Sequence, residues 1–270
     1  MKHEYRLGAI PAPPAIGEYG VRMTASAFPV AWKQIDLPKH YEQTGNTCVP
    51  QTLRWLYSLA YGPDFGVNYV YAGGRSHSNA GMYVHEALNF LSSFGSARLT
   101  DDPYELEVPE ALDYYHANRA TQGPRALPFA GGAWARADTE AQVKQALITP
   151  HTLAKGKYLP VSVTLAVESW EPDERGRWRC QSPRIGYHQV LVKGWERVEG
   201  EEYAIIHNSW GEDWGLRGDA YVPWEDVLRV GAFVVIPRSM GKANEAAPIR
   251  RTLRLKSPYM RDGNGYLDVL

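Results

Sequence analysis

The sequence predicts an α+β protein in which a helical lobe precedes a lobe built mainly of strands. Two observations support this prediction. Between residues 47 and 148, apolar residues recur every three or four positions, as they do along one face of a helix. Between residues 159 and 236, short runs rich in Val, Ile and Tyr alternate with glycines, which is typical of strands. We expect a functional site in the cleft between two such lobes.

The first predicted helix spans Thr47–Leu59. Thr47 is a suitable N-cap, and Pro50 is tolerated in a first turn. Its apolar residues lie three or four positions apart: Val49, Leu53, Leu56 and Ala60. Three more helices are predicted, at Gly81–Phe94, Pro109–Asn118 and Thr139–Ile148.

The second half contains five predicted strands: Leu159–Val167, Gln189–Trp195, Tyr203–His207, Asp219–Val222 and Ala232–Ile236. The glycines among these runs are predicted to form turns between strands. They are Gly176, Gly194, Gly200, Gly211, Gly215 and Gly218.

Three regions are predicted along the chain. Residues 1–30 contain several prolines and glycines and are predicted to form an extended arm. Residues 31–240 are predicted to form the main domain, with a helical lobe at about 40–130 and a β lobe at about 150–240. Residues 241–270 are a tail, basic at first, which either wraps the body or makes a weak contact with a cell wall or a partner.

Composition narrows the range of partners. The protein has 270 residues, of which 44% are hydrophobic and 22% charged, and its formal net charge is -1. This balance creates no field that attracts nucleic acid or acidic membranes. No run approaches the roughly 18 apolar residues of a spanning helix, so no integral membrane contact is expected. The N-terminus has no signal-peptide pattern, which predicts a cytoplasmic location or export by a route that needs no such peptide.

No cofactor and no metal are expected. The histidines and cysteines lack the paired spacing of zinc ligands. Gly73-Gly74 is not followed by the Lys-Ser/Thr pair of a phosphate-binding loop. The two cysteines, Cys48 and Cys180, are fewer than a disulfide-stabilised secreted protein normally carries.

Three residues have the chemistry of a thiol-dependent site. Cys48 lies at a predicted helix start, where the positive end of the helix dipole favours the thiolate that a nucleophile requires. His188 directly precedes an apolar run, and Asn208 opens an unusual Asn-Ser-Trp-Gly loop. Each also has an ordinary explanation: a small buried cysteine, a structural histidine and a tight turn with aromatic packing.

The sequence around these residues resembles the papain family of cysteine peptidases. Asn208-Ser209-Trp210-Gly211, followed by Trp214-Gly215 and Gly218, is similar to the NSWG-x-x-WG-x-x-G segment of that family. His188 lies in a similar Gly-x-His-x-Val-Leu-Val context. The order Cys, His, Asn also agrees, with 140 residues between Cys48 and His188, within the family's spacing of about 130–150.

The resemblance extends over most of the chain, from about Pro29 to Ile236. Gly81–Gly95 resembles the family's glycine-led second helix, and Asp102–Tyr104 resembles the stretch that follows it. The bacterial and archaeal branch without a propeptide is the most similar. The resemblance implies a papain-like two-lobe fold, with a helical lobe, an antiparallel β-barrel-like lobe and an active site in the cleft between them.

The resemblance also implies roles for individual residues. Cys48 would be the nucleophile, His188 its base, and Asn208 the residue that orients the imidazole. Gln43 would help the Cys48 backbone N–H to stabilise the oxyanion. The sequence departs from the family here, because Gln43 lies five residues before Cys48 instead of six, and Cys-Val-Pro-Gln replaces Cys-Trp-Ala-Phe. Whether Gln43 reaches the oxyanion therefore stays open.

Three further residues are expected at the substrate. Gly81, with Ala80, would expose backbone to an extended peptide, which binds as an added strand. Trp210 would cover the histidine–asparagine hydrogen bond and exclude water from it. An ordinary helix-start role explains Gly81 equally well.

The resulting hypothesis is a cysteine-type peptidase that hydrolyses peptide or protein substrates through a thioester intermediate. One alternative is an acyl or peptidyl transferase, which would use the same triad. The other is a catalytically inactive papain-fold protein that binds peptides.

Overall fold

The computed structural model describes residues 7–10, 27–37, 40–76, 80–151, 158–180 and 185–236. The chain divides into a unit of residues Met1–Ser239 and a short unit of residues Met240–Leu270. The predicted tail, 241–270, and most of the predicted arm, 1–30, lie outside the described residues.

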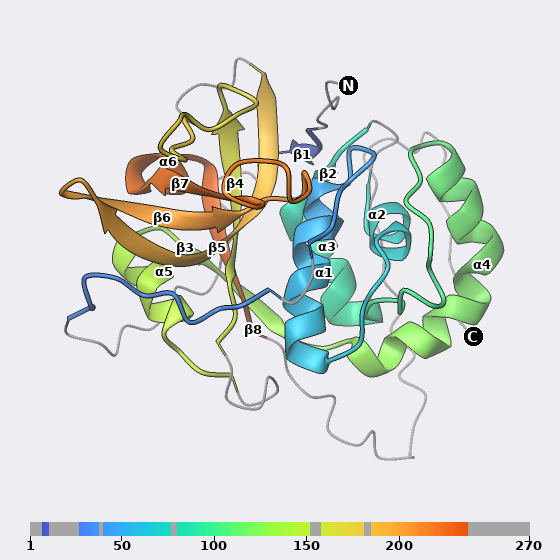
Figure 1. Cartoon of the computed structure of the whole chain (residues 1–270). Coiled ribbons are helices and arrows are strands. Elements are labelled where there is room, and N and C mark those ends of the chain that lie inside the picture. Colours follow the sequence, from blue (N-terminus) through green and yellow to red (C-terminus); the bar gives the residue numbers. More distant parts are fainter. Residues whose placement is uncertain are drawn as a thin grey trace. The chain divides into compact units, whose positions relative to one another are not determined.

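Helices occupy most of the first half of the chain. They are α1 (Cys48–Tyr61), α2 (Asn68–Gly73), α3 (Val84–Phe94), α4 (Glu110–Ala126), a 3-10 turn η1 (Leu127–Phe129) and α5 (Glu140–Leu147), with α6 (Trp224–Val230) near the end. Figure 1 shows α1 to α4 grouped on one side of the molecule and the long strands on the other. None of the helices in the described residues is long and apolar enough to cross a bilayer.

The long strands form one six-stranded sheet in which every neighbouring pair is antiparallel. Its members are β3 (Ala133–Ala137), β4 (Val161–Val167), β5 (Gly186–Val198), β6 (Glu201–His207), β7 (Asp219–Pro223) and β8 (Gly231–Ile236). Their order across the sheet is β3-β8-β4-β5-β6-β7. The combination confirms the predicted α+β class, but the described strands form an open sheet with β3 and β7 at its edges instead of a closed barrel.

Two short strands form a separate parallel pair. β1 (Ala9–Ile10) comes from the N-terminal segment, and β2 (Met82–Tyr83) directly precedes α3. β1 also contacts β5, so it lies between the helical half and the sheet. Figure 1 shows β1 in this position beside β2.

Helix α1 is the central element of the helical half. It is buried along most of its length and packs against β5. The Thr52 hydroxyl lies 2.8 Å from the Cys48 carbonyl oxygen and 3.1 Å from the Gln189 carbonyl oxygen, so its single proton is shared between the helix and the strand. This contact places Gln189 of β5 beside the first residues of α1.

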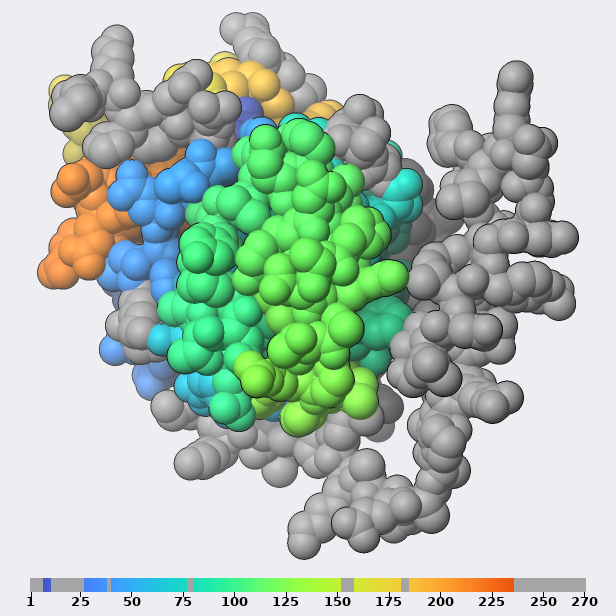
Figure 2. Space-filling view, turned by 90° about the vertical axis from the view of Figure 1, so that its right-hand side faces the viewer, coloured from blue at the N-terminus to red at the C-terminus, as the bar shows by residue number. Residues whose placement is uncertain are grey.

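The structure differs from the predicted elements in several places. Helix α4 continues eight residues beyond the predicted end at Asn118, through Gly123 and Pro124. The buried side chain of Gln122 anchors this extension by donating to the Asp101 carbonyl oxygen at 2.8 Å. In the space-filling view of Figure 2, α4, in green, covers much of the face turned toward the viewer. The sequence patterns did not predict β1, α2, β3 or α6, and the helix predicted from Gly81 begins at Val84, because Met82–Tyr83 forms β2.

The prediction of a turn at Gly194 was wrong. Gly194 lies inside β5, at an irregularity in the pairing with β6. A side chain there would place its Cβ 2.3 Å from the Trp32 carbonyl oxygen. The glycine therefore permits a close backbone approach, which one sequence does not distinguish from a turn.

Candidate active site

Cys48 is the first residue of α1 and is fully buried. Its thiol forms hydrogen bonds with the backbone of Gln189, the residue after His188, and with the backbone of Gly8. Burial raises the pKa of the Cys48 thiol to about 12, although these backbone hydrogen bonds oppose the shift by favouring the thiolate. The thiol thus lies beside the start of β5 and is protonated at neutral pH in this state.

His188 and Asn208 form a buried pair. His188 Nε2 and Asn208 Oδ1 are 2.6 Å apart, and the same oxygen accepts a hydrogen bond from the Ser209 N–H at 2.8 Å. An atom that accepts from Ser209 is the amide oxygen, so His188 Nε2 must be the donor. His188 Nδ1 is then the basic nitrogen, and it has no hydrogen-bond partner among the described residues.

The surroundings of His188 are apolar. Its ring stacks on Trp210, with centroids 4.5 Å apart and planes inclined by 29°, and Trp178 approaches edge-on at 6.4 Å. Burial lowers the pKa of His188 to about 4, while the hydrogen bond with Asn208 opposes this shift. The imidazole is therefore neutral at pH 7 in this state. Trp210 is itself buried, against Trp178 and Trp214.

Gln43 lies in the loop that leads into α1 and is also buried. Its side-chain amide donates to the Gly45 carbonyl oxygen at 2.9 Å and accepts a hydrogen bond from the Ser209 hydroxyl. Its backbone N–H donates to the Ser209 carbonyl oxygen at 2.8 Å. The loop before Cys48 is thereby tied to the loop after Asn208.

Gly81 lies beside the segment that contains β1. Its φ is +87°, which favours glycine, and its N–H donates to the Tyr71 hydroxyl at 3.3 Å. A Cβ on Gly81 would lie 2.6 Å from the Gly8 carbonyl oxygen. The next residue, Met82, donates its N–H to that same oxygen at 2.7 Å. Ala80 is exposed beside this contact.

The segment Leu7–Ile10 covers the candidate site. Gly8 contacts the Cys48 thiol, Ala9 and Ile10 pair with Met82 and Tyr83, and Cys48 and His188 both have 0% of their surface exposed. The chain's own backbone therefore lies along the edge that includes Gly81. No sequence pattern predicted this contact, because the arm has no pattern beyond its prolines and glycines.

Two carboxylates near the site were also absent from the sequence prediction. Glu105 and Glu107 accept hydrogen bonds from the loop between Gln43 and Cys48. In the sequence, 61 residues separate Glu105 from Thr44 and Glu107 from Asn46, so no local pattern could pair them. A Glu-x-Glu sequence in a polar stretch is ordinary for an exposed loop.

Comparisons with known proteins agree with this geometry. The family model described as papain family cysteine protease matches residues 76–225, which include His188 and Asn208 and begin after Cys48. Human cathepsin O is 28% identical over 142 residues, which cover 50% of this chain and 39% of the relative. Mouse testin-2 is 25% identical over 150 residues, which cover 53% of this chain and 41% of the relative. The chain thus spans less than half the length of these curated relatives.

Solved structures of low sequence identity share the fold. Xylellain, a cysteine protease from Xylella fastidiosa, superposes with a TM-score of 0.68 at 18% identity, covering 86% of this chain and 96% of that one. Procathepsin B S9 from Trypanosoma congolense gives 0.65 at 13% identity, covering 86% and 87%. The family model covers more than half of the chain, and these structures share its arrangement of helices and antiparallel sheet. The chain therefore belongs to the papain family of cysteine proteases.

Proposed function

We propose that this chain is a cysteine-type peptidase that hydrolyses peptide bonds through Cys48, His188 and Asn208. The observation that supports it best is the 2.6 Å contact between His188 Nε2 and Asn208 Oδ1, which leaves Nδ1 as the base. Cys48 supplies a nucleophile beside the same strand, at a helix start that favours the thiolate.

The first half of the reaction would form a thioester. The Cys48 thiol proton passes to His188 Nδ1, and the sulfur attacks the carbonyl carbon of the scissile amide. The tetrahedral intermediate then collapses, the C–N bond breaks, and the leaving amine takes the proton from Nδ1. Asn208 keeps the imidazole in the required orientation throughout, as the third member of a triad does.

The second half would release the acid. His188 Nδ1 accepts a proton from water as its oxygen attacks the thioester carbon, and the C–S bond breaks as the proton returns to sulfur. In both halves a negative charge develops on the carbonyl oxygen. The Cys48 backbone N–H and the Gln43 side chain are the donors that we propose for it, and one such donor is worth about 10²–10³ in rate.

The substrate would bind as an extended peptide along Gly81 and Met82. The pairing of Ala9 and Ile10 with Met82 and Tyr83 supports this proposal, because it demonstrates that a strand fits there. The substrate has to displace Leu7–Ile10 to reach Cys48. The free energy needed to uncover the site therefore lowers the observed rate of cleavage. Ala80, exposed beside Gly81, and Trp210, stacked on His188, would border this position.

The test compares peptide cleavage by the wild type and by Cys48→Ala and His188→Ala. New peptide termini in a mixed peptide library, read by mass spectrometry, should appear with the wild type and disappear with Cys48→Ala. Cleavage by His188→Ala should fall at least about 10²-fold, since general acid–base catalysis contributes about 10²–10⁴. Equal cleavage by Cys48→Ala would refute the proposal. So would the absence of cleavage by both the wild type and Gly8→Ala, a variant that we expect to displace the covering segment, because a Cβ on Gly8 would lie 2.0 Å from the Asn46 carbonyl oxygen.

Two further measurements address the thioester. Mass spectrometry of the quenched reaction should detect an acyl group on Cys48, which a reaction without a covalent intermediate would never form. Addition of a primary amine distinguishes hydrolysis from transfer. A peptidase should release mainly the free acid, whereas a transferase should release mainly the new amide.

A further inference from the structure

Two carboxylates hold the loop that leads into the nucleophile. Glu105 Oε1 accepts hydrogen bonds from the backbone N–H groups of Thr44, at 3.0 Å, and Gly45, at 3.1 Å. Glu107 Oε1 accepts a hydrogen bond from the backbone N–H of Asn46. Three consecutive N–H groups of the loop thus donate to two side chains from the stretch before α4.

The same carboxylates also bind two helices that follow the loop in the sequence. Glu105 also accepts from the Thr47 hydroxyl and from the Gln51 side-chain amide, the latter at 3.0 Å on its second oxygen. The second oxygen of Glu107 accepts from the Tyr71 hydroxyl at 3.1 Å. The loop is therefore fixed relative to both α1 and α2.

These bonds replace a regular backbone ladder. Residues 43–47 belong to no helix or strand, so their N–H groups require other acceptors where the loop is covered. Carboxylates form shorter and stronger hydrogen bonds with N–H groups than neutral acceptors do. The loop begins at Gln43 and ends at the Cys48 N–H, the two groups that we propose as donors to the oxyanion.

We propose that Glu105 and Glu107 are positioning residues for the reaction: they hold the loop from Gln43 to Cys48 in the geometry that stabilises the oxyanion. This inference depends on the proposed peptidase activity. The two carboxylates act through the loop, because their hydrogen bonds go to the loop and to the helices α1 and α2. A displacement of about 1 Å in such donors can cost about 10²-fold in rate.

Amide hydrolysis and alkylation both use the Cys48 thiol, and comparing their rates distinguishes a positioning role of the two carboxylates from a purely structural one. In amide hydrolysis the carbonyl oxygen becomes an anion, so the rate depends on the oxyanion donors. In alkylation by iodoacetamide the thiolate displaces iodide at a saturated carbon, and no oxyanion forms. A loss of positioning therefore slows hydrolysis selectively, whereas a loss of folding or of thiolate slows both reactions together.

The experiment uses the full chain with Glu105→Ala and Glu105→Gln, which retains one acceptor oxygen. For a peptide amide, kcat/KM should fall about 10–100-fold in Glu105→Ala and less in Glu105→Gln, mainly through kcat. The rate of Cys48 alkylation should stay within twofold of the wild type in both. The free energy needed to displace Leu7–Ile10 enters both reactions and cancels in their ratio.

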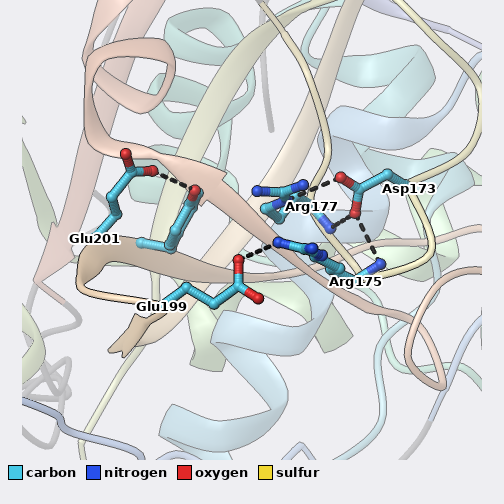
Figure 3. Close-up of polar contacts among 6 residues, drawn as sticks. Asp173, Arg175, Arg177, Glu199 and Glu201 are labelled. Carbon is cyan, nitrogen blue, oxygen red and sulfur yellow. Dashed lines mark hydrogen bonds and ion pairs between the residues drawn. The ribbon is translucent and has the colours of Figure 1, made fainter.

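Glu199→Gln is the matched control. Glu199 forms an exposed ion pair with Arg175, in the group of polar contacts that Figure 3 shows around Asp173 and Arg177. None of these interactions involves the loop before Cys48. The rates of hydrolysis and of alkylation should therefore stay unchanged in Glu199→Gln.

The outcomes are distinct. The inference is wrong if hydrolysis by folded Glu105 variants stays within twofold of the wild type, or if hydrolysis and alkylation fall by the same factor. If Glu105→Ala does not fold, as judged by its unfolding transition, Glu105→Gln and Glu107→Gln decide by the same ratio. Absence of hydrolysis in the wild type despite normal alkylation would instead refute the proposed function.

Discussion

Substitution of Gly8 by alanine should uncover the candidate active site. A Cβ on Gly8 would lie 2.0 Å from the Asn46 carbonyl oxygen, whereas Cβ atoms in proteins essentially never approach another heavy atom within 3.0 Å. Asn46 is held by Glu107, so the covering segment is the part that can move. We therefore expect Leu7–Ile10 to leave the edge formed by Met82 and Tyr83.

The size of the expected effect can be estimated from the hydrogen bonds that hold Leu7–Ile10 in place. The Met82 N–H donates to the Gly8 carbonyl oxygen at 2.7 Å, and Ala9 and Ile10 pair with β2. A hydrogen bond contributes about 0.5–1.5 kcal/mol net, so loss of this small set should amount to about 1–3 kcal/mol. Because 1.4 kcal/mol corresponds to a factor of ten, the uncovered fraction should rise about 5- to 150-fold.

The assay is the rate of iodoacetamide alkylation of Cys48 at pH 7, followed by peptide mapping to separate it from the other cysteine, Cys180, which is also buried. Gly123→Ala is the matched control, since a Cβ there meets nothing closer than 3.6 Å. Alkylation of folded Gly8→Ala at the wild-type rate would refute the reasoning. An equal acceleration in Gly123→Ala would mean that general opening, not the covering segment, limits access.

Three further predictions concern His188 and the two residues that contact it, Asn208 and Trp210. Asn208→Ala leaves the His188 Nε2–H without its acceptor, so kcat/KM for a peptide should fall about 5- to 150-fold, given a cost of about 1–3 kcal/mol for an unsatisfied buried donor. Asn208→Asp keeps an acceptor oxygen and should lose less; equal losses would contradict this role. His188 should titrate near pH 4 in NMR spectra of the wild type, because burial lowers its pKa to about 4, and at higher pH in Gly8→Ala. In the unfolded chain this histidine binds a proton at about pH 6.5, so the free energy of unfolding should fall by about 3 kcal/mol as the pH drops from 6.5 to 4. His188→Gln should remove this pH dependence. If the pH dependence persisted in His188→Gln, it would not come from the burial of His188. Trp210→Ala should lower the free energy of unfolding by about 3–5 kcal/mol in urea titrations, because the ring is buried against His188 and two other indoles. Trp170→Ala, where 38% of the residue is exposed, should cost less, and an equal cost would contradict the reasoning.

Much of the fold could be predicted from local patterns. The helix at α1 and the strands from β4 to β8 lie close to their predicted ranges. The apolar residues of α1 recur every three or four positions, and the strands are short runs rich in Val, Ile and Tyr that turn residues separate. α2 was missed because six residues are too few to establish a period. The extension of α4 was missed because Gly123 and Pro124 disfavour helix locally, whereas the bond between Gln122 and Asp101 is a tertiary contact.

The residues of the candidate site could also be selected from local sequence patterns, whereas the contacts between them could not. Cys48, His188 and Asn208 could be selected from the sequence because each residue type has its own chemistry and each occurs in a distinctive local context. The structure brings His188 and Asn208 together at 2.6 Å and places the Cys48 thiol against the backbone of Gln189. These contacts are consistent with the predicted roles, which the experiments proposed above would test.

The fold class, the family resemblance and the residues able to perform thiol chemistry could all be predicted from residue type and short-range spacing. Contacts between groups far apart in the sequence could be identified only in the folded chain. It brought Glu105 and Glu107 onto the loop before Cys48 and laid Gly8 over the thiol itself. The physical reason is that such hydrogen bonds satisfy whichever polar groups the packed chain brings within about 3 Å, and no periodicity in the sequence encodes that proximity.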